Sequence, residues 1–299
     1  MAVKRRHYRP DDAERISSFL IRHYKPGNAD GNWLQPAWEY ALTHPLLDEH
    51  SLGAKTLWED DGELIGICHY EHRLGEAFFQ LHPAHPDLKP TMLDCAEVNL
   101  RAANDEGRVY LKVFANDFDH EFESTLIARG YHPVPEWNRP LYEYEIAGPV
   151  RAPALPNGFR LQTLADGNDL AKWHRVLWRG FDHEGEPPKE GIAERRIMQS
   201  GPNYRLDLAM VVVEPGGQFV SFCGMWYVPE CRYAYVEPVA TDPDYRRMGL
   251  GKAAVLAGIR TCAEEGATVA YVGSDQAFYK ALGFQKRHVA NCFLKRFER

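Results

Sequence analysis

The sequence predicts a mixed α/β protein made of two similar halves, each a mostly antiparallel, twisted sheet flanked by helices. Three observations support this fold class. One Pro/Gly-rich stretch divides the chain, each half contains a hairpin pattern, and strand and helix patterns follow the same order on both sides. With 299 residues, the chain has room for two domains of ordinary size.

The dividing stretch covers residues 148–158, which hold three prolines and two glycines in eleven positions. Proline cannot continue a helix or donate to a central strand ladder, so this composition is typical of a semi-rigid linker. We therefore expect one domain at residues 1–147 and a second at residues 159–299.

The first half begins with a short strand and an acid-rich helix start at residues 9–16. A hairpin follows, because β-prone runs at residues 55–58 and 64–70 flank an Asp-Asp-Gly turn. A strand at residues 77–81 then runs into a proline-bearing loop. The half ends in strand, helix and the pair Gly130-Tyr131.

The second half repeats this order. Its helix start lies at residues 164–170, and its hairpin runs at residues 208–213 and 219–227 flank a Glu-Pro-Gly-Gly turn. The next strand is predicted at Tyr233–Thr241, before a loop with Pro243. The remaining predicted elements are a helix through Ala254, a strand at residues 267–273 and a last helix ending in Leu282-Gly283-Phe284.

Composition narrows the function classes. Residues 1–150 carry 15 basic and 25 acidic residues (−10) and residues 151–299 carry 20 and 17 (+3), which sum to the net charge of −7. No basic cluster with interleaved aromatics indicates nucleic acid, and no apolar run is long enough to span a membrane. The six cysteines form no Cys-x-x-Cys pair, which favours reduced thiols in a cytoplasmic protein. We expect a monomer or homodimer.

The most informative segment is residues 246–251, Arg-Arg-Met-Gly-Leu-Gly, between a predicted strand and a predicted helix. Backbone N–H groups at a helix start lack intrahelical partners, and the helix dipole adds positive potential there. Glycine lets the backbone approach a bulky ligand. The segment therefore predicts a phosphate or pyrophosphate site; the alternative is a helix start that happens to hold two glycines beside surface arginines.

Two other phosphate-binding motifs do not fit. A P-loop requires a hydroxyl residue after the lysine, but Ala253 follows Lys252. A dinucleotide fingerprint requires a third glycine, but Ala254 stands three residues after Gly251.

The segment resembles the acetyl-CoA pyrophosphate loop of the GNAT superfamily of N-acetyltransferases, whose pattern is Arg/Gln-x-x-Gly-x-Gly/Ala. The preceding strand and the later Phe278-Tyr279-Lys280-Ala281-Leu282-Gly283-Phe284 are similar to that family's flanking landmarks. The resemblance covers roughly residues 158–299. It implies a tandem-GNAT protein that uses acetyl-CoA (coenzyme A). The implied cofactor-binding residues are Val239, Ala240, Thr241, Arg246, Arg247, Met248, Gly249, Leu250, Gly251, Lys252, Ala253, Ser274 and Phe278.

The resemblance also implies two catalytic residues. Tyr279 matches the tyrosine that protonates the thiolate leaving group; the alternative is a tyrosine packed in the core. Glu237 lies on the strand entering the loop, where family members often place a carboxylate that acts as base. Strand alternation would put Tyr235, Glu237 and Val239 on one face, and burial would raise the pKa of the carboxyl; a purely structural glutamate is the alternative. Pro238 predicts a bulge or a splayed partner strand.

Candidate substrate contacts are Trp226, Tyr235 and His183, which could line an acceptor pocket. We expect no metal site, although His82 with His85 has a spacing that a metal could use, because a second ligand pair is missing.

The first half lacks the features of the second. Its corresponding loop, residues 82–90, has no glycine, and its prolines remove N–H donors. Leu126 stands where the second half has Tyr279. We expect a degenerate first copy, structural or shaping one wall of the substrate site.

The predicted function is acetyl transfer from acetyl-CoA to a primary amine of a small molecule, by direct attack in a ternary complex. A non-catalytic acyl-CoA-binding regulator or sensor is the alternative, and another acyl donor such as succinyl-CoA stays open.

Overall fold

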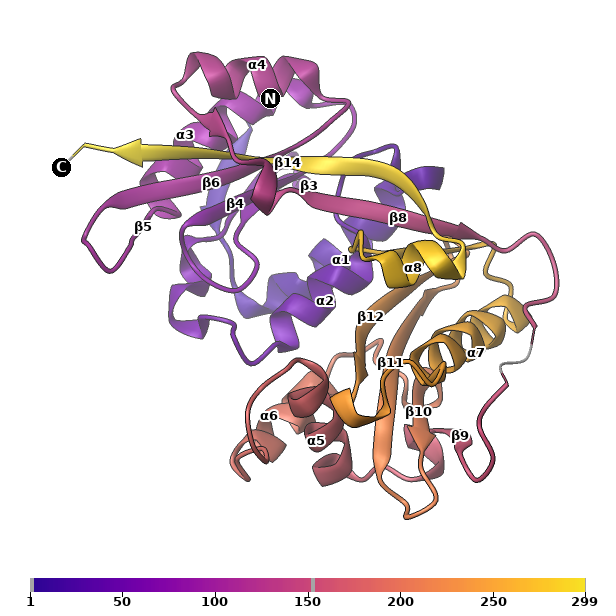
Figure 1. Cartoon of the computed structure of the whole chain (residues 1–299). Coiled ribbons are helices and arrows are strands. Elements are labelled where there is room, and N and C mark those ends of the chain that lie inside the picture. The colour runs from indigo at the N-terminus through magenta and orange to yellow at the C-terminus, as the bar shows by residue number, and fades with distance from the viewer. Residues whose placement is uncertain (1–2, 152–153, 299) are drawn as a thin grey trace. The chain divides into compact units, whose positions relative to one another are not determined.

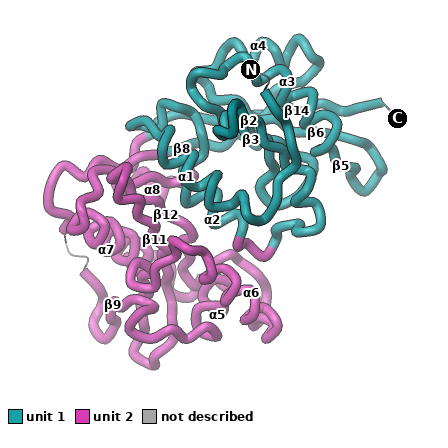
Figure 2. Tube along the Cα trace, turned by 180° about the vertical axis from the view of Figure 1, so that it is seen from behind, with its two compact units in different colours: residues 1–42, 46–141, 286–299 teal, residues 43–45, 142–285 magenta. Residues whose placement is uncertain are grey.

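The computed structural model describes residues 3–151 and 154–298, and the chain divides into two compact units (Figure 1, Figure 2). The first unit comprises the described residues up to Leu42, Leu46–Leu141 and those from Lys286 onward. The second comprises Thr43–Pro45 and Tyr142–Gln285. Residues 152 and 153 of the predicted linker lie outside the described residues, and the rest of the linker forms neither helix nor strand.

The first unit contains a sheet with strand order β1-β2-β3-β4-β6-β14, in which β4 and β6 are parallel and the other neighbours antiparallel. Short strands β5 and β7 pair with β6 and β14. The strands are β1 (Lys4–His7), β2 (Thr56–Asp60), β3 (Glu63–His69), β4 (Glu76–Leu81), β5 (Ala102–Ala103), β6 (Val109–Asn116), β7 (His132–Pro133) and β14 (Gln285–Phe297). The helices are α1 (Ala13–His23), α2 (Gln35–Thr43), α3 (Lys89–Asn99) and α4 (His120–Ala128).

Apolar side chains cover both faces of this sheet. On one face, Met92 and Leu93 of α3 pack in a cluster with Ile65 and Val113 of the strands. On the other, buried residues of α1 and α2 pack with residues of β2 and β3; they include Ile16, Leu20, Trp38, Leu57 and Ile67. The sheet is therefore the middle layer of this unit, as its β-prone runs flanked by helix patterns predict.

The second unit has the strand order β8-β13-β12-β11-β10-β9, with β12 and β13 parallel and the other neighbours antiparallel. Its strands are β8 (Arg139–Glu145, of which residues 142–145 pair here), β9 (Arg160–Thr163), β10 (Ala209–Val213), β11 (Phe219–Val228), β12 (Tyr233–Thr241) and β13 (Val269–Val272). Its helices are α5 (Leu170–Gly180), α6 (Gly191–Met198), α7 (Leu250–Glu264) and α8 (Ala277–Leu282). The 3-10 turns of both units are η1 (Pro10–Asp12), η2 (Pro26–Asn28), η3 (Glu49–Ala54), η4 (Pro86–Leu88), η5 (Pro135–Trp137), η6 (Leu164–Asp166), η7 (Leu206–Leu208) and η8 (Pro243–Tyr245).

Helix α7 packs closely on its sheet because small residues face the strands. A Cβ built at Gly258 would lie 2.2 Å from Met225 Cγ, so only glycine fits there. Ala254 and Ala257 are likewise buried against the strand residues of the same core. Close approach fixes the helix, and with it the N-terminus at Leu250, relative to the end of β12.

The prediction of two mostly antiparallel sheets flanked by helices is confirmed, and so are both hairpins and the strand Tyr233–Thr241. Apart from the short strands β5 and β7 of the first copy, each copy follows the order strand, two helices, three strands, helix, strand, helix, strand. The compact units differ from the division at residues 147 and 159. The last strand of each copy pairs in the other unit, since β8 completes the second sheet and β14 the first. Local patterns carry no information on such long-range pairing.

No helix among residues 3–151 and 154–298 has the length and apolarity that a bilayer crossing requires. None of the six cysteines, all of which are described, forms a disulfide, and Cys231 is the one that is not fully buried.

Candidate functional site

A pocket of about 670 Å³ opens in the second unit where β12 ends and α7 begins. Its volume lies within the range usual for small-molecule sites. The wall comes from the C-terminus of α5, the end of β12, the 245–252 loop and the start of α8. Its residues are Gly180, Phe181, Asp182, Val239, Ala240, Thr241, Tyr245, Arg246, Arg247, Gly249, Leu250, Gly251, Lys252, Gln276, Phe278 and Tyr279.

Strand β12 parts from its parallel neighbour β13 at this pocket. On the parallel side, its pairing with β13 ends at Tyr235, so residues 236–241 run on beyond the paired positions of the described residues. On the antiparallel side, the register shifts so that Glu237 and Pro238 both oppose Gly224. A Cβ at Gly224 would lie 2.4 Å from the Glu237 carbonyl oxygen, so this bulge requires glycine there. The bulge that Pro238 predicts is present.

The bulge corrects the expected alternation of β12. Val236 belongs to the buried core beneath α7, and Val239 packs against the same core, whereas Tyr235 does not belong to it. The extra residue at the bulge reverses the side-chain parity, so Tyr235 and Val239 lie on opposite faces.

The loop before α7 presents its backbone N–H groups without partners. Arg247 has φ +64° and Gly249, the N-cap of α7, has φ +80°. Within the described part of the chain, no hydrogen bond uses the N–H of any residue from 247 to 252, and the first such bond of the helix is that of Ala253 to Gly249. Left-handed residues next to a helix start form a concave nest of donors suited to a phosphate.

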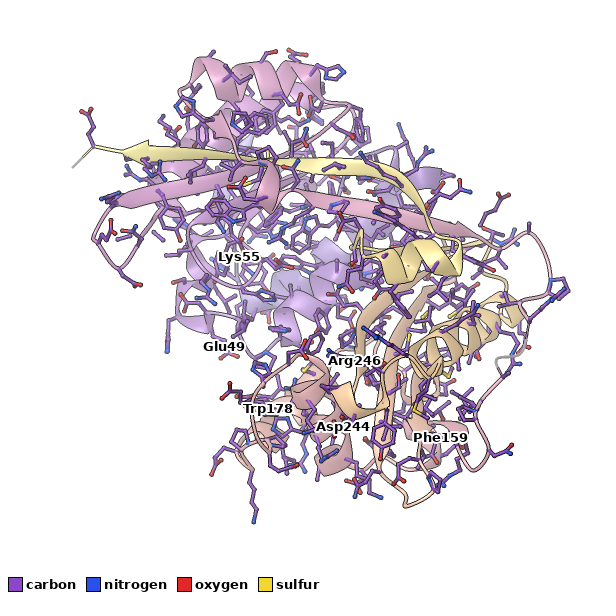
Figure 3. The ribbon with its side chains drawn as sticks, viewed as in Figure 1. Glu49, Lys55, Phe159, Trp178, Asp244 and Arg246 are labelled. Atoms are coloured by element: carbon purple, nitrogen blue, oxygen red, sulfur yellow. The ribbon has the colours of Figure 1, made fainter. Side chains whose placement is uncertain are left out.

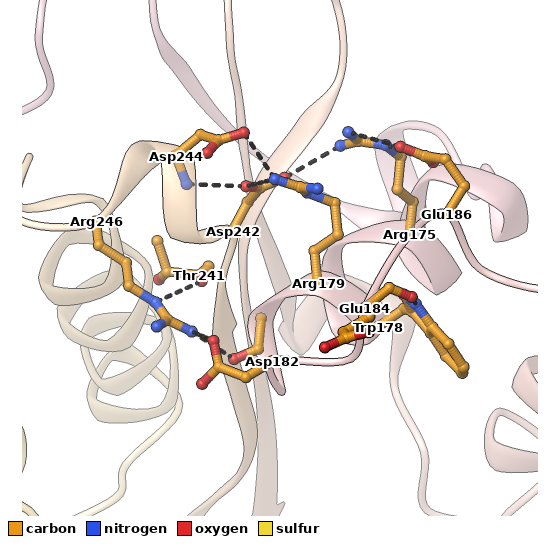
Figure 4. Close-up of polar contacts among 11 residues, drawn as sticks. Arg175, Trp178, Arg179, Asp182, Glu184, Glu186, Thr241, Asp242, Asp244 and Arg246 are labelled. Atoms are coloured by element: carbon orange, nitrogen blue, oxygen red, sulfur yellow. Dashed lines mark hydrogen bonds and ion pairs between the residues drawn. The ribbon is translucent and has the colours of Figure 1, made fainter.

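The side chain of Arg246 is already engaged. Its guanidinium donates to the carbonyl oxygens of Gly180 (3.0 Å) and Thr241 (3.3 Å) and pairs with Asp182 at 2.8 Å (Figure 4). These contacts tie the end of α5 to the end of β12, where a Cβ on Gly180 would lie 2.6 Å from Ala240 Cβ. By contrast, the exposed side chain of Arg247 forms no ion pair with any described residue.

A buried carboxylate anchors the same junction. Asp242 accepts from Arg179 at 2.6 and 3.0 Å, from Arg175 at 3.1 Å and from the N–H of Asp244 at 3.1 Å (Figure 4). Burial by itself would raise the pKa of Asp242, but the hydrogen bonds from Arg179 and Asp244 and the charges of both arginines outweigh it and lower that pKa. The network therefore holds α5, β12 and the loop in one arrangement.

We expect Asp242→Asn to destabilise the protein by about 3 kcal/mol, because it leaves two arginines beside a buried neutral group. Asp242 has a side-chain exposure of 1% and its neighbour Asp244 one of 73%, so Asp244→Asn is a matched control that should cost under about 1 kcal/mol. Urea unfolding at pH 7 measures both. The lowered pKa means that this stabilisation is present above the ordinary aspartate pKa and is lost as the pH falls. Equal costs for the two variants would contradict the anchor role.

Tyr279 lies on the first turn of α8 with its side chain 7% exposed and in the pocket wall. Its hydroxyl forms no hydrogen bond with a described residue and is not sealed from the pocket. Burial first, and then the charges of Cys223 and Glu237, raise its pKa well above the usual tyrosine value. The phenol therefore keeps its proton at all physiological pH values, and Glu237 lies close enough for its charge to be felt.

The other predicted site residues are placed as follows. Phe278 and Gly251 meet in the pocket wall, since a Cβ on Gly251 would lie 3.4 Å from the Phe278 ring. Ser274 caps the turn before α8 by accepting from the Gln276 N–H at 3.4 Å. Met248 is exposed beside the pocket, and Ala253 is buried in the first turns of α7.

The three predicted substrate residues do not line this pocket. Trp226 is 2% exposed, donates to the Glu237 carbonyl oxygen at 2.9 Å and packs on Tyr204, so it supports the bulge from within the core. Tyr235 is buried beside Trp226 in the strand pairing. His183 is exposed and stacks on Trp178 with ring centroids 4.3 Å apart.

Sequence reasoning missed the two neighbours of Phe181 at the end of α5, Gly180 and Asp182. Gly180, Phe181 and Asp182 line the pocket, and the Phe181 side chain is 52% exposed there. The available signal was a glycine at the end of a predicted helix, followed by an apolar residue in an otherwise acidic segment. Tyr245 and Gln276 are further wall residues that the motif did not include.

Comparison with known families and curated proteins gives one consistent result. Residues 169–284 match the family described as the acetyltransferase (GNAT) family. The mycothiol acetyltransferase of Paenarthrobacter aurescens is 28% identical over 180 residues, which cover 56% of this chain and 54% of that protein. That of Saccharomonospora viridis is 30% identical over 146 residues, covering 44% and 48%. The chain thus spans about half the length of the curated relatives it matches.

Solved structures share the fold over nearly the whole chain. A tandem GNAT protein from the clavulanic acid biosynthesis pathway superposes with a TM-score of 0.66 at 14% identity, covering 99% of this chain and 98% of that one. A GCN5-related N-acetyltransferase from Sphaerobacter thermophilus gives 0.64 at 18% identity, covering 98% and 95%. At these identities the similarity is one of fold.

Proposed function

We propose, from the acetyltransferase (GNAT) domain that the chain carries at residues 169–284, that the protein transfers an acetyl group from acetyl-CoA to a primary amine of a small molecule. The observation that carries this proposal is the row of unpartnered N–H groups at residues 247–252, beside a pocket that runs along the freed end of β12. Such a row is suited to a diphosphate, which is the most highly charged part of the CoA donor.

The pocket offers a candidate contact for each part of the CoA donor. Amides near Gly249 would hold the diphosphate, with Arg247 and Lys252 adding charge at the rim. Beyond Tyr235, β12 stays paired with β11 but no longer with β13. On that open side the backbone of Val239 and the N–H of Thr241 would bind the amide-rich pantetheine arm as an added strand, while the Thr241 carbonyl oxygen is engaged by Arg246. Arg246 would support the donor site through its tether to α5, since its guanidinium is occupied and its backbone N–H donates to the Pro243 carbonyl oxygen.

The chemistry requires two proton transfers. The donor supplies an acetyl carbonyl and a thiolate leaving group. As the amine nitrogen forms its bond to the carbonyl carbon and the C–S bond breaks, the Tyr279 hydroxyl gives its proton to the departing sulfur. Glu237, directly or through water, takes the proton that the nitrogen loses, and each such assistance is worth about 10²–10⁴-fold. We propose no covalent enzyme intermediate, because the reaction as drawn requires no enzyme nucleophile.

The relatives named mycothiol acetyltransferase support an amine acceptor of small-molecule size. We propose the same class of acceptor here, in a cytoplasmic protein that needs neither nucleic acid nor membrane. The chain's limited coverage of these relatives leaves the particular amine to experiment.

The function is tested by acetyl-CoA-dependent thiol release from the full chain, screened over amines, polyamines, aminoglycosides and amino acids. Saturable release with one amine class supports the transferase. Tight acetyl-CoA binding without release of thiol over the whole panel would instead identify an acyl-CoA-binding regulator. Competition between acetyl-CoA and succinyl-CoA identifies the donor.

We expect Tyr279→Phe to lower kcat about 100-fold while leaving the affinity for acetyl-CoA within twofold, because it removes only the proton donor. The matched control is Tyr245→Phe, which deletes the other tyrosine hydroxyl of the same pocket wall. Steady-state kinetics and calorimetry separate the two effects. Wild-type kcat in Tyr279→Phe, or equal losses in both variants, would remove the acid role.

A further inference from the structure

A second pocket, of about 220 Å³, opens in the first unit between the ends of β4 and β6. These two parallel strands pair only at Glu76–Lys112 and Ala77–Val113, after which their described residues continue without pairing to each other. The pocket wall consists of Lys25, Ala29, Asp30, Gly31, Asn32, Phe79, Leu81, His82, Pro83, Pro86, Lys89, Phe114, Ala115, Asn116, Phe118, Asp119 and Phe122.

This pocket occupies the same topological position as the pocket of the second unit. In each unit it lies at the carboxyl ends of the one parallel strand pair, between the following helix start (α3 or α7) and the start of the next helix (α4 or α8). The loop after the first helix of each copy also contributes, near Asp30 and near Asp182. Carboxyl ends of parallel strands are a common ligand position in open α/β sheets.

The loop chemistry of the first-unit pocket excludes a diphosphate. Between residues 82 and 90, three prolines have no N–H, and five further N–H groups are used. Ala84 donates to the His82 ring, and His82, His85, Leu88 and Lys89 donate to backbone oxygens. Asp87 has the remaining amide of this segment. The six unpartnered amides at residues 247–252 therefore have no counterpart here, and the smaller volume excludes a nucleotide as well.

The rest of the pocket wall suits a small ligand with a largely apolar surface. Four phenylalanines line the pocket, and Phe79 and Phe122 have ring centroids 5.5 Å apart. Phe118 contributes a side chain that is 47% exposed, so much of its apolar surface faces solvent. Its exposed face is available to a ligand.

The pocket wall carries two lysines and two aspartates, and among these four only Lys89 and Asp119 form an ion pair. Lys89 pairs with Asp119, so these charges offset each other. The Asp30 carboxylate accepts the backbone N–H groups of Lys25 (2.9 Å) and Asn32 (3.1 Å). The Lys25 ammonium forms no ion pair among residues 3–151 and 154–298. A carboxylate head group would meet this cation at the exposed side of the pocket.

We propose that the first unit binds a small carboxylate with an aromatic or branched aliphatic body between the ends of β4 and β6. The first copy has thus lost the diphosphate cradle and retained the space between its strands. This inference is independent of the transferase proposal, since it concerns a different unit and a different ligand.

The test uses the full chain and ligand-observed NMR with phenylacetate, 3-phenylpropionate and isovalerate, with phenylacetamide as the uncharged match. We expect saturable binding of at least one acid, about tenfold tighter than that of the amide. Lys25→Met should remove this preference, and Phe118→Ala should weaken both ligands by about fivefold. Both sites are surface positions whose substitution leaves the cores intact.

Lys252→Met in the other pocket is the matched control. It should weaken acetyl-CoA and leave the carboxylates unchanged, whereas Lys25→Met should do the reverse. The proposal is overturned if no acid binds saturably, if acetyl-CoA displaces the bound acid competitively, or if Lys25→Met and Phe118→Ala bind the acids as the wild type does. Failure of thiol release, in contrast, would leave the carboxylate result standing.

Discussion

Gly249→Trp is expected to lower the affinity for acetyl-CoA by at least about 100-fold. Gly249 has φ +80° and no atom lies within 4 Å of a Cβ built on it, so the new side chain has room to enter the pocket. There it would cover the amides of residues 247–252. Loss of several charge-assisted hydrogen bonds to a diphosphate accounts for a reduction of this size.

Two controls separate blocking from backbone strain. Gly249→Ala carries the same left-handed penalty of about 1–2 kcal/mol without the bulk, and should retain most of the affinity. Gly217, in the β10–β11 turn, also has a positive φ (+91°) and open space, so Gly217→Trp should lose similar stability with wild-type affinity. Isothermal calorimetry and thermal unfolding measure the two quantities. Unchanged acetyl-CoA affinity in Gly249→Trp would reject the assignment of the site.

The elements near the site could be predicted because their signals are local. A β-prone run ending at Thr241, a proline, and then two glycines before an alanine-rich stretch place a strand, a turn and a helix start next to one another in the chain. The left-handed N-cap at Gly249 requires only that one residue be a glycine. Hydrogen-bond donors supplied by the backbone therefore follow from sequence position alone.

Side-chain roles were harder to predict, because they depend on partners far away in sequence. Arg246 has the charge expected of a phosphate ligand, yet Asp182, 64 residues earlier, engages it. Trp226 has the chemistry of a pocket wall, yet it faces Tyr204 and the bulge. The bulge itself reverses the faces of β12 after Val236. No periodicity argument that assumes a regular strand could find this.

The first copy also shows what a missing motif does and does not imply. The absence of glycine and the three prolines in residues 82–90 indicate a loop with few free amides, and of these residues only Asp87 keeps an unused N–H. The loop alone does not determine whether the first copy is structural, shapes one wall of the substrate site or binds a ligand of its own. The separation of β4 from β6 beyond Ala77 depends on strand pairing, and the loop sequence carries no information on that pairing.

Lys55 offers the largest expected effect on stability. Figure 3 marks its position in the first unit. The residue is 0% exposed, and its ammonium nitrogen has no hydrogen-bond partner among the described residues. The nitrogen lies 4.6 Å from the Tyr70 ring centroid, 5.0 Å from that of Trp38 and 5.7 Å from that of Tyr8. These rings offset part of the cost of burying the charge. Burial nevertheless lowers the pKa of Lys55 to about 7, from its ordinary value of 10.5.

The sign of the pH dependence follows from proton counting. Below pH 7 both the folded and the unfolded chain hold the proton, and the full cost of burying the cation is present. Between pH 7 and 10.5 the unfolded chain still binds a proton that the folded chain has released, so stability rises with pH. The titratable side chains beside Lys55 do not change their protonation between pH 7 and 10.5. Burial lowers the pKa of His69 to about 3 and raises that of Tyr8 to about 12, and burial with Asp48 raises the pKa of Tyr70 further.

We expect Lys55→Met, which keeps the length of the side chain and removes the charge, to stabilise the protein by up to about 4 kcal/mol at pH 7 and by less than about 1 kcal/mol at pH 10. Urea unfolding at pH 7, 8.5 and 10 gives the free energy of unfolding of the variant and of the wild type. The contributions of all other titrating groups cancel in the difference between the two. Lys4→Met, at an exposed position of the same unit, should show neither effect. If Lys55→Met gains the same stability at all three pH values, improved packing is the cause and not the removal of a buried cation. If the variant is destabilised, the aromatic cluster needs the amine. Either result would mean that the cost of burying this ammonium group among Tyr8, Trp38 and Tyr70 does not explain its effect on stability.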